Sequence, residues 1–252
     1  MNGWLKDLDL EGISVEQLVA HLEELRRRFI WVLLFFVITF IVALLFVNRI
    51  YGVLEAPMGS QKLVILGPAE VVHVYFALAG MSALSITLPF AVWQLWLYVR
   101  PALRQTEQRI IRAYVVPTII MFFLGVSFGY FVIFPLVFEF LMKLAKINFI
   151  PMITASEYVK FLLNLILPIG IMFELPVVIL ILSRLGIVTP KLLVRARKYA
   201  YFILIIIASM LSPPELVSHL SVAVPLILLY EVSVTLSKLV ERRKNIRNRE
   251  KT

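Results

Sequence analysis

Residues 29–47 read FIWVLLFFVITFIVALLFV, a run of 19 residues without a charge. At about 1.5 Å of rise per residue, a helix of this length crosses most of a hydrocarbon core that is roughly 30 Å thick. The rest of the chain is also apolar, with 61% hydrophobic residues and a mean hydropathy of +0.92. Soluble domains are about 45–50% apolar. The composition therefore predicts an all-α integral membrane protein.

Further apolar runs extend this prediction. Residues 71–99 and 113–138 carry no Asp, Glu, Lys or Arg, and residues 161–183 carry only Glu174. Two shorter uncharged runs, 199–214 and 216–230, lie on either side of Glu215. They correspond either to two short spans or to one re-entrant hairpin, and we favour two short spans. The expected architecture is a bundle of six transmembrane helices, several of them kinked by proline, with the last two short.

Helix boundary signals support this division. Pro68, Thr154 and Pro190 each stand where a helix is expected to begin, and Ser212–Glu215 combines proline with a capping box. One helix is therefore expected to end near Leu211 and another to begin near Pro213. Prolines inside the runs are expected to kink the helices; they are Pro89, Pro117, Pro135, Pro168 and Pro176.

The positive charges predict the topology. Residues 1–28, 100–112, 184–198 and 238–252 hold 20 of the 25 Lys and Arg residues. Positive charge is retained in the cytoplasm, so both termini are expected on the cytoplasmic side. We interpret residues 1–252 as a single polytopic domain. It comprises a cytoplasmic amphipathic helix (1–28), a six-span bundle (29–238) and a basic tail (239–252).

Composition also argues against several kinds of site and partner. The chain has no cysteine and only three histidines, so we expect no disulfide, no metal site and no cofactor. The net charge of +9 is explained by topology, together with binding to anionic lipids, and we expect no nucleic acid partner.

The segment before the first span has an amphipathic pattern. Leu18, Leu22, Leu25 and Phe29 recur at helical spacing and form one apolar stripe, while the other faces carry acids and arginines. This pattern predicts an interfacial helix that leads into the first span.

This segment also carries a motif, HLEELRRR at residues 21–28. It resembles the N-terminal signature of the TatC family, the multispanning core of the twin-arginine protein translocase. Further stretches match that family in order, and they are Ala56-Pro57, Pro101-Ala102-Leu103 with Glu107, Phe173-Glu174-Leu175-Pro176 and Ser212-Pro213-Pro214-Glu215. The resemblance covers nearly the whole chain.

The resemblance implies a function in protein transport. Members of the family are not enzymes in the bond-making sense. They bind twin-arginine signal peptides of folded precursors at the cytoplasmic face of the prokaryotic inner membrane. They recruit TatA-type and TatB-type single-span partners, and transport is driven by the proton-motive force. A homo-oligomer within a receptor complex is also implied.

The resemblance assigns roles to individual residues. It places Glu24, Arg26, Tyr98 and Glu107 on the signal-peptide recognition surface. It links Glu174 to the partner helix, Pro57 to the periplasmic cap and Glu215 to the loop between the last two helices. The chain departs from the family pattern at Arg104, where tyrosine is frequent, at Glu215, where aspartate is frequent, and at His219, where glutamine is common.

The chemistry of the acidic residues also suggests roles for them, independently of the resemblance. Two separated carboxylates suit two arginines, because a guanidinium pairs with carboxylate in a bidentate geometry. The alternative for Glu24 is an i,i+4 ion pair with Arg28; for Glu107 it is a pair with Arg104 or Arg112.

A carboxylate in the middle of a span, such as Glu174, costs about 2.5–3.5 kcal/mol on insertion scales and therefore indicates function. The alternatives are a local hydrogen bond, for example to Asn164, or the proton site of a proton-coupled small-molecule transporter.

Overall fold

The computed structural model describes residues 15–55, 63–99, 113–211 and 216–249, and all regular elements in these ranges are helices. Pro57, Glu107 and Glu215 lie outside the described residues. In chain order the elements are α1 (Val15–Leu45), α2 (Val47–Glu55), α3 (Pro68–Val99), α5 (Val115–Phe128), the π-helical turn η3 (Gly129–Ile133), α6 (Phe134–Asn148), α7 (Ala155–Met172), α8 (Leu175–Leu185), α9 (Pro190–Leu211) and α10 (Leu216–Arg249).

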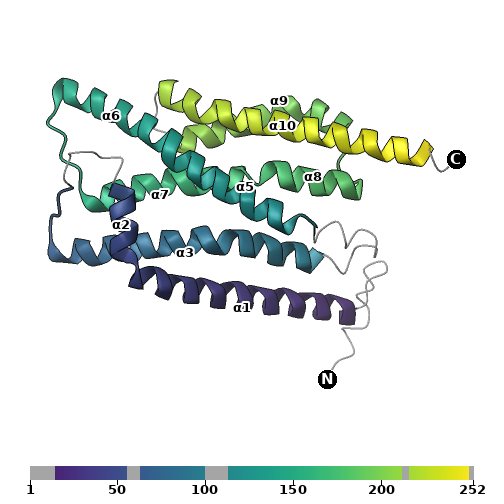
Figure 1. The fold of residues 1–252 in the computed structure, drawn as a ribbon, viewed down its shortest axis with the longest axis horizontal. Helices are drawn as coiled ribbons and strands as arrows, with labels where there is room; N and C mark the ends of the chain where they lie inside the picture. Colours follow the sequence, from purple (N-terminus) through teal and green to yellow (C-terminus); the bar gives the residue numbers. More distant parts are fainter. Residues whose placement is uncertain (1–14, 56–62, 100–112, 212–215, 250–252) are drawn as a thin grey trace.

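The long helices lie side by side along one axis (Figure 1). Helix α1 packs on α3, α10 packs on α8 and α9, and α7 lies between α3 and α5. The core is centred on α7, where Leu162, Leu165 and Ile166 are fully buried. We call the end at which α1 begins and α3 ends the α1 end of the bundle; α8 and α10 also end there, on the right of Figure 1.

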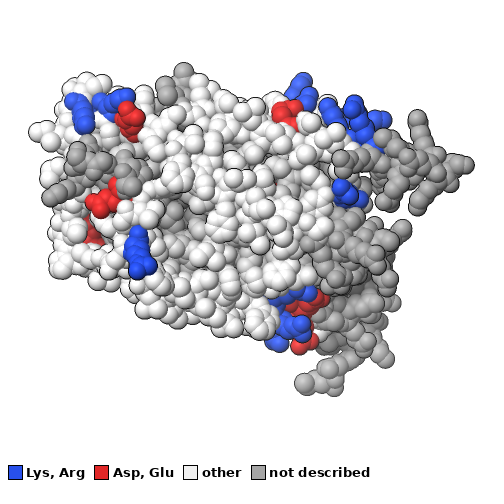
Figure 2. All heavy atoms as spheres, viewed as in Figure 1, with Lys and Arg blue, Asp and Glu red and all other residues white. Residues whose placement is uncertain are grey.

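Five helical stretches of the described chain are long and apolar enough to span a membrane, and they are His21–Leu45, Pro68–Tyr98, Val115–Asn148, Ala155–Leu185 and His219–Arg242. The chain is therefore a multi-pass membrane protein. Helix α9 is not among these stretches, because four basic residues occupy its first half. Figure 2 shows charged side chains gathered toward the two ends of the long axis, with an uncharged band between them.

The boundary signals at Pro68, Thr154 and Pro190 are confirmed, whereas the signal at Ser212–Glu215 lies outside the described residues. Helix α3 begins at Pro68 and α9 at Pro190. The hydroxyl of Thr154 caps α7 by accepting a hydrogen bond from the Glu157 amide at 3.2 Å. Helix α9 ends at Leu211 as expected, and α10 is described from Leu216.

The prolines behave less uniformly than expected. Pro176 lies in the first turn of α8, directly after the interruption that separates it from α7. Pro135 lies in the first turn of α6, directly after the π-helical turn. Pro89 and Pro168 lie inside continuous helices, α3 and α7. Two of these four prolines therefore follow a change in the helical hydrogen-bond pattern, and the other two lie in helices that continue without one.

The amphipathic segment and the first span form one helix. Helix α1 runs from Val15 to Leu45 without a break. The described residues of its apolar stripe are largely exposed, with Leu22, Leu25 and Phe29 58%, 41% and 66% exposed. The stripe is thus available to lipid or to a partner.

Hydrogen bonds between distant segments stabilise the end of the bundle that lies opposite the α1 end. Val64 and Thr154 form a parallel β-bridge. The Glu70 carboxylate accepts hydrogen bonds from the amides of Leu66 at 2.7 Å and Ser156 at 3.2 Å. The Tyr158 hydroxyl donates to the carbonyl of Leu54 at 2.6 Å, which ties α2 to α7.

Candidate functional site

Polar side chains of α1 and α3 meet at the α1 end of the bundle. We call His21, Glu24, Arg28, Gln94 and Tyr98 the α1–α3 cluster. The Arg28 guanidinium donates to Glu24 Oε1, with Nε at 3.1 Å, and its Nη1 donates to Gln94 Oε1 at 3.2 Å. The rings of His21 and Tyr98 stack with centroids 4.3 Å apart.

Helical spacing explains why these residues meet. Positions 21, 24 and 28 lie three and four residues apart, so they share one face of α1. Gln94 and Tyr98 are four residues apart on α3. The two faces meet because Phe35 and Phe90 stack one layer further into the bundle, with centroids 4.5 Å apart. The apolar packing of the two helices therefore sets the register of the polar cluster.

Glu24 is both paired and accessible. Its side chain is 29% exposed and that of Arg28 is 20% exposed. The i,i+4 pair with Arg28, the structural alternative considered from the sequence, is therefore formed. Arg28 uses only Oε1 of the carboxylate, and Oε2 has no hydrogen bond to any described residue. One oxygen of Glu24 thus remains available to a donor from outside the chain.

The other recognition residues are placed unequally. Arg26 lies apart from the cluster, where its guanidinium is 3.7 Å from Glu23 and both side chains are at least 70% exposed. Tyr98 belongs to the cluster and lies two residues before the 100–112 segment. Because Glu107 lies outside the described residues, its place on the recognition surface stays a prediction.

Glu174 occupies the interruption between α7 and α8. It is 5% exposed and stands at the N-cap position of α8, where its side chain makes no capping hydrogen bond. Neither carboxylate oxygen has a hydrogen-bond partner among the described residues. The alternative of a hydrogen bond to Asn164 is therefore not realised. A buried carboxyl without a partner is costly, so a polar group from another molecule would stabilise it.

The joint before Glu174 is packed against glycine. A Cβ on Gly125 of α5 would lie 2.6 Å from Phe173 Cβ and 3.0 Å from Gly170 Cα. Only glycine allows this approach, so α5 lies directly against the last turn of α7. The position of Glu174 therefore depends on a close contact between α5 and α7.

With this geometry in place, relatives can be compared. Residues 20–225 match the family model of the Sec-independent protein translocase protein (TatC). The chain belongs to the TatC family. It is 45% identical over 227 residues to the Sec-independent protein translocase protein TatCd of Bacillus subtilis (strain 168), covering 90% of this chain and 93% of that protein. It is 37% identical to TatCy of the same organism, covering 92% of each chain.

Solved TatC structures share the fold. The crystal structure described as the twin arginine translocase receptor TatC superposes with a TM-score of 0.77 at 31% identity, covering 88% of this chain and 99% of that one. A second TatC crystal structure, obtained in the detergent DDM, gives a TM-score of 0.78. The sequence-based assignment to the TatC family is confirmed, and the protein is a component of a protein translocase.

Two polar contacts of this TatC protein were missed by the sequence analysis. Gln94 is one, since nothing in the sequence distinguishes it from an interfacial glutamine. The other is a network in which Arg197 donates to Glu231 at 2.6 Å and the Tyr201 hydroxyl donates to the same carboxylate. Arg197 and Tyr201 of α9 lie 34 and 30 positions before Glu231 of α10, so only the packing of the two helices reveals the network.

Proposed function

We propose that this chain is the signal-peptide receptor and core of a twin-arginine translocase. The observation that carries the proposal is the Glu24 carboxylate, which is held on the face of α1 that meets α3 by Arg28, itself bonded to Gln94 near the end of α3. In this proposal both termini are cytoplasmic and the α1 end of the bundle faces the cytoplasm. Folded precursors are exported with TatA-type and TatB-type partners, driven by the proton-motive force.

Recognition rests on the chemistry of arginine. A guanidinium donates two parallel hydrogen bonds to a carboxylate, whereas an ammonium acts as a compact point charge. Glu24 would receive one arginine of the signal peptide and Glu107 the other. Tyr98 would flank the site. Arg26, which is 74% exposed, would hold the neighbouring Glu23 carboxylate in place through their ion pair.

Arg28 has a defined part in this exchange. It neutralises Glu24 while no peptide is bound, and its second contact, to Gln94, remains when an incoming arginine takes over the carboxylate. The site would thus exchange one guanidinium for another, and Glu24 would never be left unpaired. This exchange favours arginine over lysine, because only a guanidinium donates two parallel hydrogen bonds to a carboxylate.

The test is binding of a twin-arginine peptide to the purified protein, with a twin-lysine peptide as the control. Glu24→Gln and Glu107→Gln should each weaken binding by about 10- to 100-fold, since a charge-assisted hydrogen bond is worth about 1.5–3 kcal/mol. Glu139→Gln serves as the matched control, because Glu139 lies on α6, is 67% exposed and pairs with Lys143. Equal affinity for the two peptides in the unmodified protein would refute the receptor function.

We propose further that Glu174 binds a polar group on the membrane helix of a TatA-type partner. Both carboxylate oxygens lack a partner among the described residues, so an incoming hydrogen bond would relieve an existing cost. Glu174→Leu should therefore stabilise the isolated chain by about 1–3 kcal/mol while it abolishes cross-linking to the partner helix. Unchanged cross-linking in the Glu174→Leu variant would exclude this role.

A further inference from the structure

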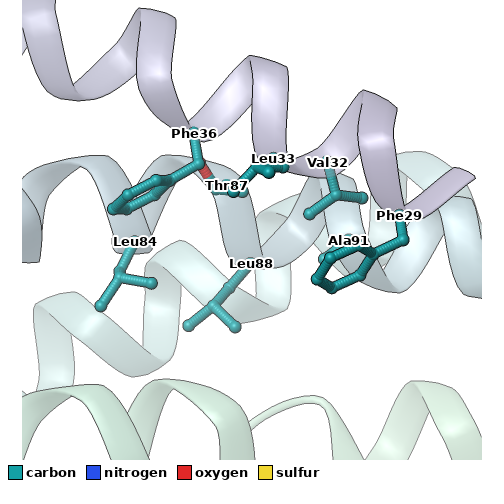
Figure 3. A pocket seen from close by; sticks show the side chains of 8 residues that line it. All are labelled: Phe29, Val32, Leu33, Phe36, Leu84, Thr87, Leu88 and Ala91. Atoms are coloured by element: carbon teal, nitrogen blue, oxygen red, sulfur yellow. The ribbon is translucent and has the colours of Figure 1, made fainter.

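A groove runs along the outside of the bundle between α1 and α3. Figure 3 shows the side chains that line it, which come from two consecutive turns of each helix. The lining includes Phe29, Leu33 and Phe36 of α1 and Leu84, Leu88 and Ala91 of α3. The groove is apolar along this whole length.

The groove begins beside the α1–α3 cluster. Phe29 directly follows Arg28, and Ala91 precedes Gln94 by three residues, which is about one helical turn. The exposed apolar stripe of α1 also leads into it, since Leu22 and Leu25 are spaced to lie on the same face as Phe29. A polar recognition site and an apolar groove are therefore continuous.

We infer that this groove receives the apolar segment of the signal peptide, in helical form, while one arginine of the peptide pairs with Glu24 in the α1–α3 cluster. This inference rests on the proposed receptor function. A secretory signal peptide has a positively charged region followed by about 7–15 apolar residues. That order matches the order of cluster and groove along α1.

The dimensions fit this occupant. The groove extends from Phe29 to Phe36 on α1, about 10 Å along the helix, and a helical peptide segment of seven residues has the same length. Docking of a helix into such a groove uses side chains at every third or fourth position. The peptide would thus present two turns of its apolar segment to α1 and α3.

Packing explains why the peptide would replace lipid there. Lipid tails are as apolar as leucine, so helices associate in membranes through close packing and small residues, not through the hydrophobic effect. Ala91 provides a small residue at the mouth of the groove. The one hydroxyl in the lining, that of Thr87, lies 3.3 Å from the Thr39 hydroxyl, so it is paired within the chain and leaves the groove apolar to a peptide.

Leu33 and Leu34 offer a matched test. Both are leucines at the same depth of α1 and are 51% and 47% exposed, but only Leu33 lines the groove. A photo-crosslinking residue at position 33 should label the apolar segment of a bound twin-arginine peptide, and one at position 34 should not. The label at position 33 should be lost with a twin-lysine peptide.

A binding measurement completes the test. Leu33→Trp should fill the groove and weaken binding of the full signal peptide about tenfold, the equivalent of about 1.4 kcal/mol, while Leu34→Trp leaves it unchanged. A truncated peptide that ends after the arginines should bind both variants equally well.

The outcomes separate the two proposals. If the twin-arginine peptide is preferred over twin-lysine but positions 33 and 34 label it equally or not at all, the groove assignment is wrong and the receptor function stands. The same conclusion follows if position 33 labels only lipid or a TatA-type helix, or if Leu33→Trp weakens the truncated peptide as much as the full one. If neither peptide is preferred, both proposals fail.

Discussion

Replacement of Gly125 by alanine tests whether the contact between α5 and α7 is as close as the structure has it. The new Cβ would lie 2.6 Å from Phe173 Cβ and 2.7 Å from Phe173 Cγ, whereas ordinary contacts begin at 3.4 Å. The overlap is therefore about 0.8 Å. Because Phe173 Cβ is attached directly to the backbone at the end of α7, rotation of the Phe173 side chain cannot relieve the overlap with it.

The magnitude follows from this overlap. The helices must separate, or the joint between α7 and α8 must shift, and such overpacking costs about 1–3 kcal/mol. In a chain of this size each kcal/mol lowers Tm by about 2–4 °C. We therefore expect Gly125→Ala to lower the apparent Tm by about 2–12 °C in a thermal unfolding assay of the detergent-solubilised protein.

Gly80→Ala is the matched control. A Cβ at Gly80 of α3 would lie 3.8 Å from the Phe40 ring, an ordinary contact, and alanine is favoured over glycine within a helix by about 1 kcal/mol. The control should therefore be neutral or stabilising. A Gly125→Ala variant as stable as Gly80→Ala would refute the close contact and, with it, the argument that the α5–α7 contact positions Glu174.

Two further predictions concern hydrogen bonds between distant segments. Tyr158→Phe removes the donor to the Leu54 carbonyl and should destabilise the protein by about 1–2 kcal/mol, measured as apparent Tm. Arg197→Gln removes the ion pair with Glu231, whose side chain is 32% exposed, and should cost about 1 kcal/mol, less at high salt.

Helix α9 provides a control of the same kind of substitution for each variant. Tyr199 is 74% exposed, so Tyr199→Phe should leave the apparent Tm unchanged. Lys198 is exposed and forms no ion pair with a described residue, so Lys198→Gln should also be neutral. A loss in the controls as large as in the variants would indicate a general effect of substitution on α9, not a specific contact.

The sequence predicted the helical elements well because apolar runs and capping signals act locally. The start of α3 at Pro68, the Thr154 cap and the end of α9 at Leu211 depend on residues within one turn, and all were predicted. The TatC family could also be assigned, because its motifs are short and occur in order. The six-span count and the cytoplasmic location of the termini stay predictions.

Contacts between helices could not be predicted in the same way. Nothing near Glu231 in the chain indicates that it pairs with Arg197 of α9, since the pairing depends on how α9 and α10 pack. A kink at Pro176 was expected, and the helix is interrupted at Phe173 and Glu174, but its exact position was not predicted. Pro168 lies in an unbroken helix, so proline alone does not distinguish a break from a continuous helix.

The hydrogen bonds opposite the α1 end have a mechanical consequence. The Val64–Thr154 bridge, the Glu70 carboxylate and the Tyr158 hydroxyl join segments from α2 to α7 at one end of long, nearly rigid rods. Rods joined at one end move least there and most at their free ends. We therefore expect the helices to pivot at that end. A small change of angle between α1 and α3 would then produce a larger displacement at the mouth of the groove.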